Sequence, residues 1–166
     1  MSQATQVGWT AAQIAADVRA GRRAAVDTVT DALARIRAYD DDVAAFQVVR
    51  GDRALAEAIE VDARADRSSL PLAGVPIAVK DNVPVAGEPM RVGSAATTDA
   101  PQQSDHPVVE RIRAAGGIVV GLTRVPELCV FGATDSVHGI TRNPWDLART
   151  PGGSSGGSAC RCRHGH

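Results

Sequence analysis

This sequence has few aromatic residues, no long apolar run and a net charge close to zero. Aromatic side chains make up 3% of the 166 residues, so a core must combine many small aliphatic groups that each bury little area. No apolar run approaches the roughly eighteen residues that a membrane helix needs, and residues 1–6 lack the basic start and apolar stretch of a signal peptide. With 18 basic and 19 acidic side chains the net charge is -1, which excludes a strong overall attraction to nucleic acid or an anionic membrane.

Cysteine is also scarce, with three in the chain. Cys129 lies in an apolar segment, whereas Cys160 and Cys162 lie among the last seven residues, which is not the framework of a disulfide-rich secreted protein. The hydrophobic share of 44% and the charged share of 22% are typical of a folded globular domain. We therefore predict one domain in a reducing compartment, the cytoplasm.

Apolar residues recur at helical spacing in several segments. The pattern predicts helices over residues 10–21, 27–37, 52–65 and 105–115. Thr10 and Gln13 have the spacing of a capping box, and Asp52 and Asp105 are predicted to cap the third and fourth helices. The clearest amphipathic stripe is that of the second helix, formed by Val26, Val29, Leu33 and Ile36.

Three apolar runs predict strands, at residues 43–50, 74–80 and 118–122. Between the last two, residues 86–104 are rich in Gly, Ser, Thr and Pro and predict a long irregular connection that forms the wall of a site. The fourth predicted helix ends before residue 116. A glycine pair and then a buried strand follow it directly. This order predicts an α/β fold in which helices cover a sheet.

The residues most informative about chemistry are a serine-rich glycine run at 151–159 and Lys80 at the end of a predicted strand. Glycines beside Ser154 and Ser155 leave backbone amides and hydroxyls accessible to a reacting group. A serine hydroxyl becomes nucleophilic when a base takes its proton, and lysine can serve as that base when burial favours its uncharged form. A flexible linker and a phosphate loop are alternative interpretations, although no lysine follows the run where a nucleotide site needs one.

Four segments together resemble the amidase signature family, namely residues 74–82, 121–127, 139–144 and 151–159. The serine-glycine run is that family's most specific motif, and the lysine strand lies the expected distance upstream. The resemblance covers about residues 8–159. It implies a mixed β-sheet sandwiched between helices, and hydrolysis of carboxamide C–N bonds by a nucleophilic serine, a serine behind a cis peptide bond and a lysine.

The resemblance also implies roles for individual residues. Lys80 matches the family's lysine, the general base, and Ser154 matches the cis serine, which relays the proton. Gly152 and Gly153 leave room for the cis bond, and Ser155 is assigned a supporting role through a local hydrogen bond.

Cys129 and Phe131 lie in the segment that borders the substrate pocket in the family, although buried packing of an apolar run explains them equally well. His106 and His138 are assigned no role. The implied partner is a small-molecule amide, with no cofactor and no metal. The family also includes the amidotransferase component that acts on misacylated tRNA together with partner proteins, and the sequence does not separate it from free-standing amidases.

The chain differs from the family after Ala159. In the family the nucleophilic serine lies in a second glycine-rich segment further along, which also supplies the oxyanion amides. Here residues 160–166 alternate Cys, Arg and His, as in a shifted reading frame or a truncation. We predict that residues 1–159 are the N-terminal part of one amidase-type domain, incomplete at its C-terminus, followed by an aberrant tail. Without the nucleophile the chain is predicted to be inactive.

A non-catalytic protein is the alternative hypothesis. The tail contains zinc-ligand types at alternating positions, Cys160, Cys162, His164 and His166. This spacing is unusual for zinc, and ordering a free terminus costs conformational entropy. Such a chain would bind metal through its tail or interact through exposed sheet edges.

Overall fold

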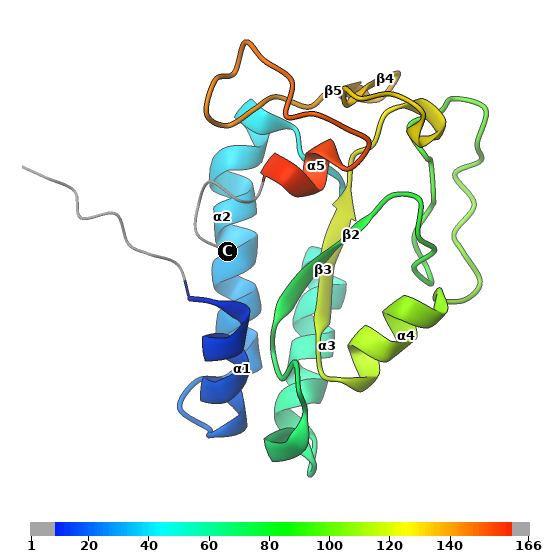
Figure 1. Cartoon of the computed structure of the whole chain (residues 1–166). Coiled ribbons are helices and arrows are strands. Elements are labelled where there is room, and N and C mark those ends of the chain that lie inside the picture. The colour runs from blue at the N-terminus through cyan, green and yellow to red at the C-terminus, as the bar shows by residue number, and fades with distance from the viewer. Residues whose placement is uncertain (1–8, 161–166) are drawn as a thin grey trace, which may run out of the picture.

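The computed structural model describes residues 9–160 and confirms the predicted α/β fold, which is built around a three-stranded sheet (Figure 1). The central strand β3 (Ile118–Thr123) pairs antiparallel with β1 (Phe46–Val49) and parallel with β2 (Pro76–Lys80). The sheet is therefore mixed, as the resemblance implied. In the range 9–160, β1 and β2 form its two edges.

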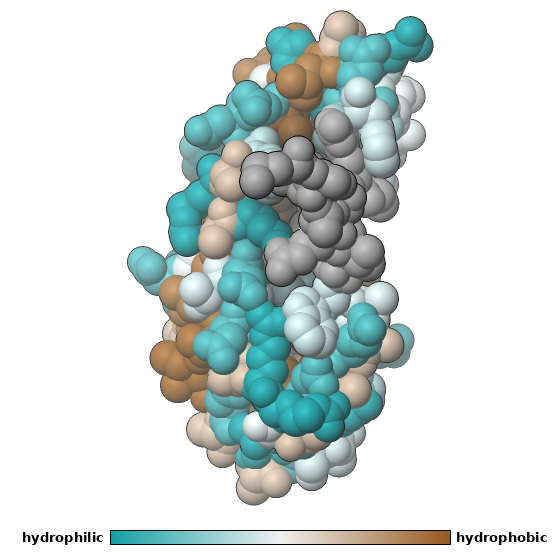
Figure 2. All heavy atoms as spheres, turned by 90° about the vertical axis from the view of Figure 1, so that its left-hand side faces the viewer, coloured by the Kyte–Doolittle hydropathy of each residue, from teal (hydrophilic) through white to brown (hydrophobic). Residues whose placement is uncertain are grey.

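Helices cover both faces of this sheet. On one side lie α1 (Ala11–Arg19), α2 (Ala25–Val43) and α3 (Gly51–Ala63), and on the other lies α4 (Pro107–Ala114) (Figure 1). The solvent face of α1 and α2 is mainly hydrophilic (Figure 2), as an amphipathic helix requires. The sandwich arrangement follows from β3, which is buried along its whole length.

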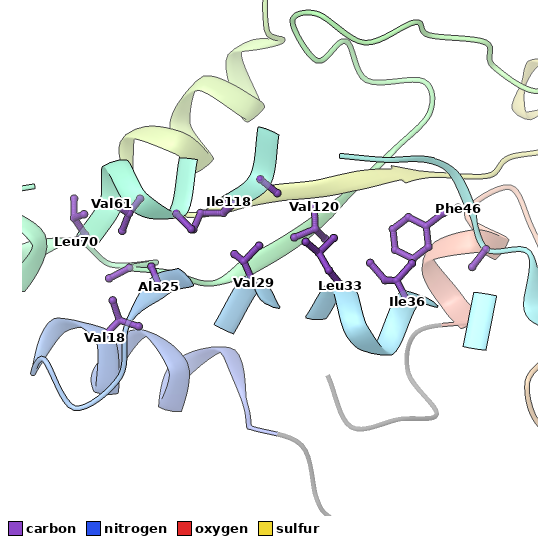
Figure 3. Packing of buried hydrophobic residues seen from close by; sticks show 14 of the residues in the cluster. Val18, Ala25, Val29, Leu33, Ile36, Phe46, Val61, Leu70, Ile118 and Val120 are labelled. Atoms are coloured by element: carbon purple, nitrogen blue, oxygen red, sulfur yellow. The ribbon is translucent and has the colours of Figure 1, made fainter. Parts of the chain in front are cut away.

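The core lies between α2, α3 and the sheet. The predicted stripe of α2 faces the sheet, with Val29 and Leu33 pointing toward Val120 of β3 and Ile36 lying beside Phe46 of β1 (Figure 3). Because successive strand residues face opposite sides, a second buried cluster forms on the other face of the sheet. Its members are Val79, Val85, Val109, Val119 and Leu122.

The first two helices begin where hydrogen bonds satisfy their free backbone amides. The predicted capping box of α1 is confirmed, with Gln13 N donating to Thr10 Oγ1 at 3.2 Å and Thr10 N donating to Gln13 Oε1 at 2.9 Å. Helix α2 begins at Ala25, two residues before the predicted start at Asp27. The reason is that the Asp62 carboxylate of α3 accepts a hydrogen bond from Ala25 N at 2.8 Å.

The predicted cap of α3 is wrong. The helix begins at Gly51 with Arg50 at the N-cap, and Asp52 lies in the first turn. A carboxylate in the first turn is still favourable, because the helix N-terminus carries a partial positive charge.

The predicted cap of α4 is wrong as well. His106 is the N-cap residue, and its Nδ1 accepts a hydrogen bond from Val108 N at 3.2 Å. Asp105 instead accepts hydrogen bonds from Ala86 N and Arg113 Nε, each at 2.7 Å. His106 therefore has a structural role that the sequence did not reveal.

A buried ionic network fixes the irregular connection of residues 86–104 to the body of the fold. The Arg50 side chain donates to Val119 O at 2.6 Å, to Glu88 Oε1 at 2.9 Å and to Glu57 Oε1 at 2.7 Å. Burial acts to raise the pKa of Glu57, but the hydrogen bond from Arg50 and the charge of Arg113 outweigh it and hold that pKa below its usual value. The network links α3, β3 and the connection.

Several short elements follow β3 or precede β2, and the sequence predicted none of them. They are η1 (Arg67–Ser69), η2 (Glu127–Cys129), the hairpin β4 (Asp135–Ser136) with β5 (Gly139–Ile140), and α5 (Gly156–Ala159). Among residues 9–160, the structure contains no helix long and apolar enough to cross a bilayer.

Candidate active site

The predicted lysine and serine meet in the structure. Lys80 Nζ donates a hydrogen bond to Ser154 Oγ at 2.8 Å, joining residues 74 positions apart. Lys80 is the last residue of β2, and Ser154 lies in the loop that leads into α5, which packs against β2 and β3. Lys80 is half-buried, and it is the only lysine in the chain.

Glycines shape the loop that holds Ser154. The peptide bond between Gly153 and Ser154 is cis, and Gly152 has a φ of 93°, a conformation that favours glycine. A Cβ at Gly153 would lie 2.6 Å from Phe131 O, so a larger residue would displace one of the two segments. The loop is therefore in contact with the backbone at Phe131.

Two buried threonines anchor this loop. Thr134 Oγ1 donates to Gly152 O at 2.8 Å, and Thr123 Oγ1 and Ser158 Oγ are hydrogen-bonded at 2.9 Å. The sequence patterns did not reveal any of these three hydroxyl groups. Ser158 lies in the serine-glycine run itself, which was the one signal that pointed to it.

Ser155 does not form the local hydrogen bond expected of it. Its side chain is exposed, and its hydroxyl has no partner within residues 9–160. Helix α5 begins directly after it without a side-chain cap. The anchoring expected of Ser155 is provided instead by Ser158 and Thr134.

Cys129 and Phe131 lie at the edge of the site region rather than in the core. Cys129 is half-buried, and Phe131 is 62% exposed. Buried packing therefore does not explain Phe131. Because the Phe131 carbonyl lies against Gly153, this segment borders the loop that holds Ser154.

Asp81 connects the end of β2 to the next loop. It is 1% exposed, its backbone N donates to Thr123 O at 3.1 Å, and its Oδ1 accepts a hydrogen bond from Arg91 N at 3.2 Å. Burial raises the pKa of Asp81, while the backbone hydrogen bonds from Arg91 and Val92 oppose that shift. This carboxyl group thus holds the 91–94 loop beside the strand end that presents Lys80.

His138 contacts the same loop. Its Nε2 lies 3.2 Å from Ser94 O, and Ser94 Oγ donates to Glu127 Oε1 at 2.8 Å. The sequence assigned no partner to His138 because the contact joins residues far apart in the chain.

No group of three or more His, Cys, Asp or Glu side chains within residues 9–160 is arranged to hold a metal ion. Cys160 is buried in the main core, and its Sγ donates to Arg142 O at 3.2 Å. Cys162, His164 and His166 lie outside the described residues. The zinc-tail hypothesis and the predicted domain boundary at residue 160 stay predictions.

A mainly apolar hollow of about 130 Å³ lies beside α2 and the start of β2. Its lining includes Trp9, Tyr39, Phe46 and Cys160, but none of the residues predicted to act in catalysis. The hollow and the Lys80–Ser154 pair are therefore separate features.

A mixed sheet between helices, with a glycine-rich serine loop placed over its edge strand, defines an α/β protein of the amidase signature type. A sequence profile of the family described as Amidase matches residues 27–161. The chain belongs to this family.

Two curated relatives illustrate the range of its members. The chain is 53% identical over 129 residues to a putative amidase, AmiB2, of Mycobacterium bovis. The aligned region covers 76% of this chain and 28% of the relative. The chain is 43% identical over 154 residues to a component of the glutamyl-tRNA(Gln) amidotransferase of Salinispora tropica, covering 91% of this chain and 31% of the relative. The chain thus spans less than a third of the length of either relative.

Solved structures also resemble this chain over nearly its whole length. One comes from an inhibitor-bound vestigial protein complex related to the origins of an s-triazine catabolic enzyme. It has a TM-score of 0.88 and 37% identity, over 95% of this chain and 35% of that one. A bacterial aryl acylamidase of the amidase signature family has a TM-score of 0.83 and 26% identity, over 93% of this chain and 33% of that one.

Proposed function

We propose that this chain supplies the general base and the proton relay of an amidase-type site that hydrolyses carboxamide C–N bonds. The observation that supports the proposal most directly is the 2.8 Å hydrogen bond between Lys80 Nζ and Ser154 Oγ. Membership of the amidase family supports the reaction class. The proposed substrate is a small-molecule amide, and the cytoplasm stays our prediction for where the protein acts.

In the proposed reaction a serine hydroxyl attacks the amide carbonyl carbon. Its proton passes to Ser154 Oγ as the Ser154 proton passes to the Lys80 amine. The lysine then returns a proton through Ser154 to the leaving nitrogen, the C–N bond breaks, and water hydrolyses the acyl-serine in the same way. Each role requires the direct Lys80–Ser154 contact seen in the structure.

We further propose that the 166-residue chain does not turn over amides by itself. No serine follows Ser158 in this sequence, and the resemblance places the nucleophile beyond that point. Incubation with a simple carboxamide should release no ammonia above background, and a fluorophosphonate that labels nucleophilic serines should form no adduct. An adduct that disappears in Ser155→Ala would show that the nucleophile is already present, and would contradict this part of the proposal.

The Lys80–Ser154 pair can be tested separately from turnover. Because Lys80 is the only lysine, isotope labelling of lysine gives one side-chain amine signal in an NMR spectrum. Ser154→Ala should shift this signal, since it removes the hydrogen-bond partner of the amine. Ser155→Ala is the matched control and should leave the signal in place, because that hydroxyl is exposed. Equal spectra for wild type and Ser154→Ala would remove the central support of the proposed function.

A further inference from the structure

A second hollow, of about 440 Å³, lies outside the residues discussed so far as catalytic. Its lining is mostly polar and consists of Gln47, Arg91, Ser94, Ala95, Thr97, Asp99 and His138. A hollow with such a lining is unsuited to a hydrocarbon group and suited to a polar one.

This polar hollow lies at the same end of the sheet as Lys80. Gln47 follows Phe46, which is the partner of Thr123 in the β1–β3 pair, and Thr123 is also the β3 partner of Lys80. On the other side, Arg91 N donates to Asp81, the residue that follows Lys80. The polar hollow and the Lys80–Ser154 pair therefore lie at the same end of the sheet, although neither Lys80 nor Ser154 lines the hollow.

The walls of the polar hollow are fixed by internal hydrogen bonds. Thr97 Oγ1 lies 2.8 Å from Arg91 O and 2.9 Å from Ser94 O, to which it donates. Ser94 is tied to Glu127, and His138 Nε2 contacts Ser94 O. The loop that carries Arg91 is therefore ordered before any ligand binds, which lowers the entropic cost of binding.

Arg91 has hydrogen-bonding capacity left over. Its Nε donates to Asp99 Oδ1 at 2.8 Å, but neither Nη1 nor Nη2 has a partner among the residues that the structure describes. The side-chain amide of Gln47 also has none within that range. The Arg91 side chain is 23% exposed and that of Asp99 is 76% exposed, so the solvated aspartate offsets little of the arginine charge.

The free edge of a guanidinium group presents two parallel N–H donors that match the two oxygens of a carboxylate. We infer that the polar hollow binds a carboxylate through Arg91 Nη1 and Nη2, assisted by the Gln47 amide, and that the substrate is an amide that also bears a carboxylate. The second half of this inference rests on the proposed function, whereas the binding of a carboxylate does not.

Succinamate, which has an amide at one end and a carboxylate at the other, is a suitable probe, and succinamide is its uncharged counterpart. Titration of the 166-residue chain, followed by the NMR signals of Arg91 Nε and of the backbone amides of residues 91–99, should show binding of succinamate. Succinamide should bind about tenfold or more weakly, since it lacks the charged partner of the arginine. Equal binding of the two compounds, or no binding of succinamate, would overturn the inference.

Three substitutions test whether succinamate binds in this hollow. Arg91→Gln should weaken succinamate binding about tenfold or more. Arg111→Gln removes the same charge from an exposed position on α4 and should leave the affinity unchanged. Asp99→Asn removes the competing carboxylate and should tighten binding by up to about fivefold, a gain that misfolding would not produce. Arg91→Gln binding as well as wild type would refute the assignment.

The outcome is separable from that of the proposed function. The succinamate titration measures the NMR signals of Arg91 and its loop. The test of the proposed function measures the signal of the Lys80 amine in the absence of ligand. Loss of the Lys80–Ser154 contact with succinamate binding retained would leave a carboxylate site unconnected with amide cleavage. The reverse result would leave the amidase proposal in place and remove the carboxylate-bearing substrate.

Discussion

The helical body of the protein and the segment between β3 and α5 bury their apolar residues very differently. In the body, formed by α1–α4 and β1–β3, the large aliphatic side chains of α2 and β3 are almost fully buried. Of twelve large hydrophobic side chains exposed in the described residues, seven lie between residues 128 and 147. They are Leu128, Val130, Phe131, Val137, Ile140, Trp145 and Leu147. Figure 2 shows hydrophobic surface at the end of the molecule where these loops lie in Figure 1.

The difference shows that the two parts are held in place by different interactions. The body is stabilised by packing of apolar side chains, and this stabilisation increases with the apolar area removed from water. The segment that borders the Ser154 loop has few buried side chains and depends on hydrogen bonds such as that of Thr134 to Gly152 O. The candidate site therefore lies where a packed framework meets a weakly packed segment.

Two isoleucines test this comparison with the same substitution. Ile118→Ala in β3 should lower the free energy of unfolding by about 3 kcal/mol, because Ile118 is 0% exposed and its removal leaves a cavity. Ile140→Ala in β5 should change it by less than about 0.5 kcal/mol, because that side chain is 53% exposed. Urea denaturation followed by circular dichroism measures both values. Similar losses for the two variants would show that the segment after β3 is packed in solution.

Thr134→Val tests the hydrogen bonds of the segment. The loss of the bond to Gly152 O should cost about 1 kcal/mol and raise hydrogen exchange at Gly157 N, which donates to Arg124 O, about fivefold. Thr28→Val is the matched control, since it removes a buried hydroxyl that donates to Gly74 O within the body. It should lower global stability without selectively exposing the Gly157 amide. If both variants raise exchange at Gly157 equally, the loop does not open independently of the body.

The parts of the fold that the sequence predicted correctly are those where one strong signal decides the structure. The stripe of Val29, Leu33 and Ile36 predicted α2 and its buried face, and the apolar run after Gly117 predicted β3 to within one residue. The caps of α3 and α4 were predicted wrongly because Asp is only one of several residues able to cap. Distant partners decided where Asp105 bonds, and those are invisible in the local sequence.

The site was predicted from the family resemblance rather than from periodicity. Lys80 and Ser154 were identified because two motifs occur at the expected separation, and the structure brings them within hydrogen-bonding distance. Thr123 and Thr134 were missed because a threonine in an apolar strand or a loop has no distinctive pattern. The positive φ values of Leu128 and Cys129 were also unpredictable, since non-glycine residues seldom adopt them.

The smallest predicted effect concerns Asp81, which connects the end of β2 to the 91–94 loop. Because burial raises its pKa in the folded protein, the charged form lowers stability at neutral pH. That loss disappears as the pH falls through the raised folded-state pKa toward the ordinary value of an unfolded aspartate. Asp81→Asn keeps an oxygen acceptor for Arg91 N but carries no charge. Its urea midpoint should therefore exceed that of wild type at pH 7 and converge with it in acid.

Asp135→Asn makes the same charge change at an exposed position of β4 and serves as the control for this effect. Its urea midpoint should differ little from wild type at either pH. A gain in Asp81→Asn that persists in acid would mean that the carboxyl group destabilises the fold through its shape or its hydrogen bonds. In that case the strand end that presents Lys80 is strained by packing rather than by a buried charge.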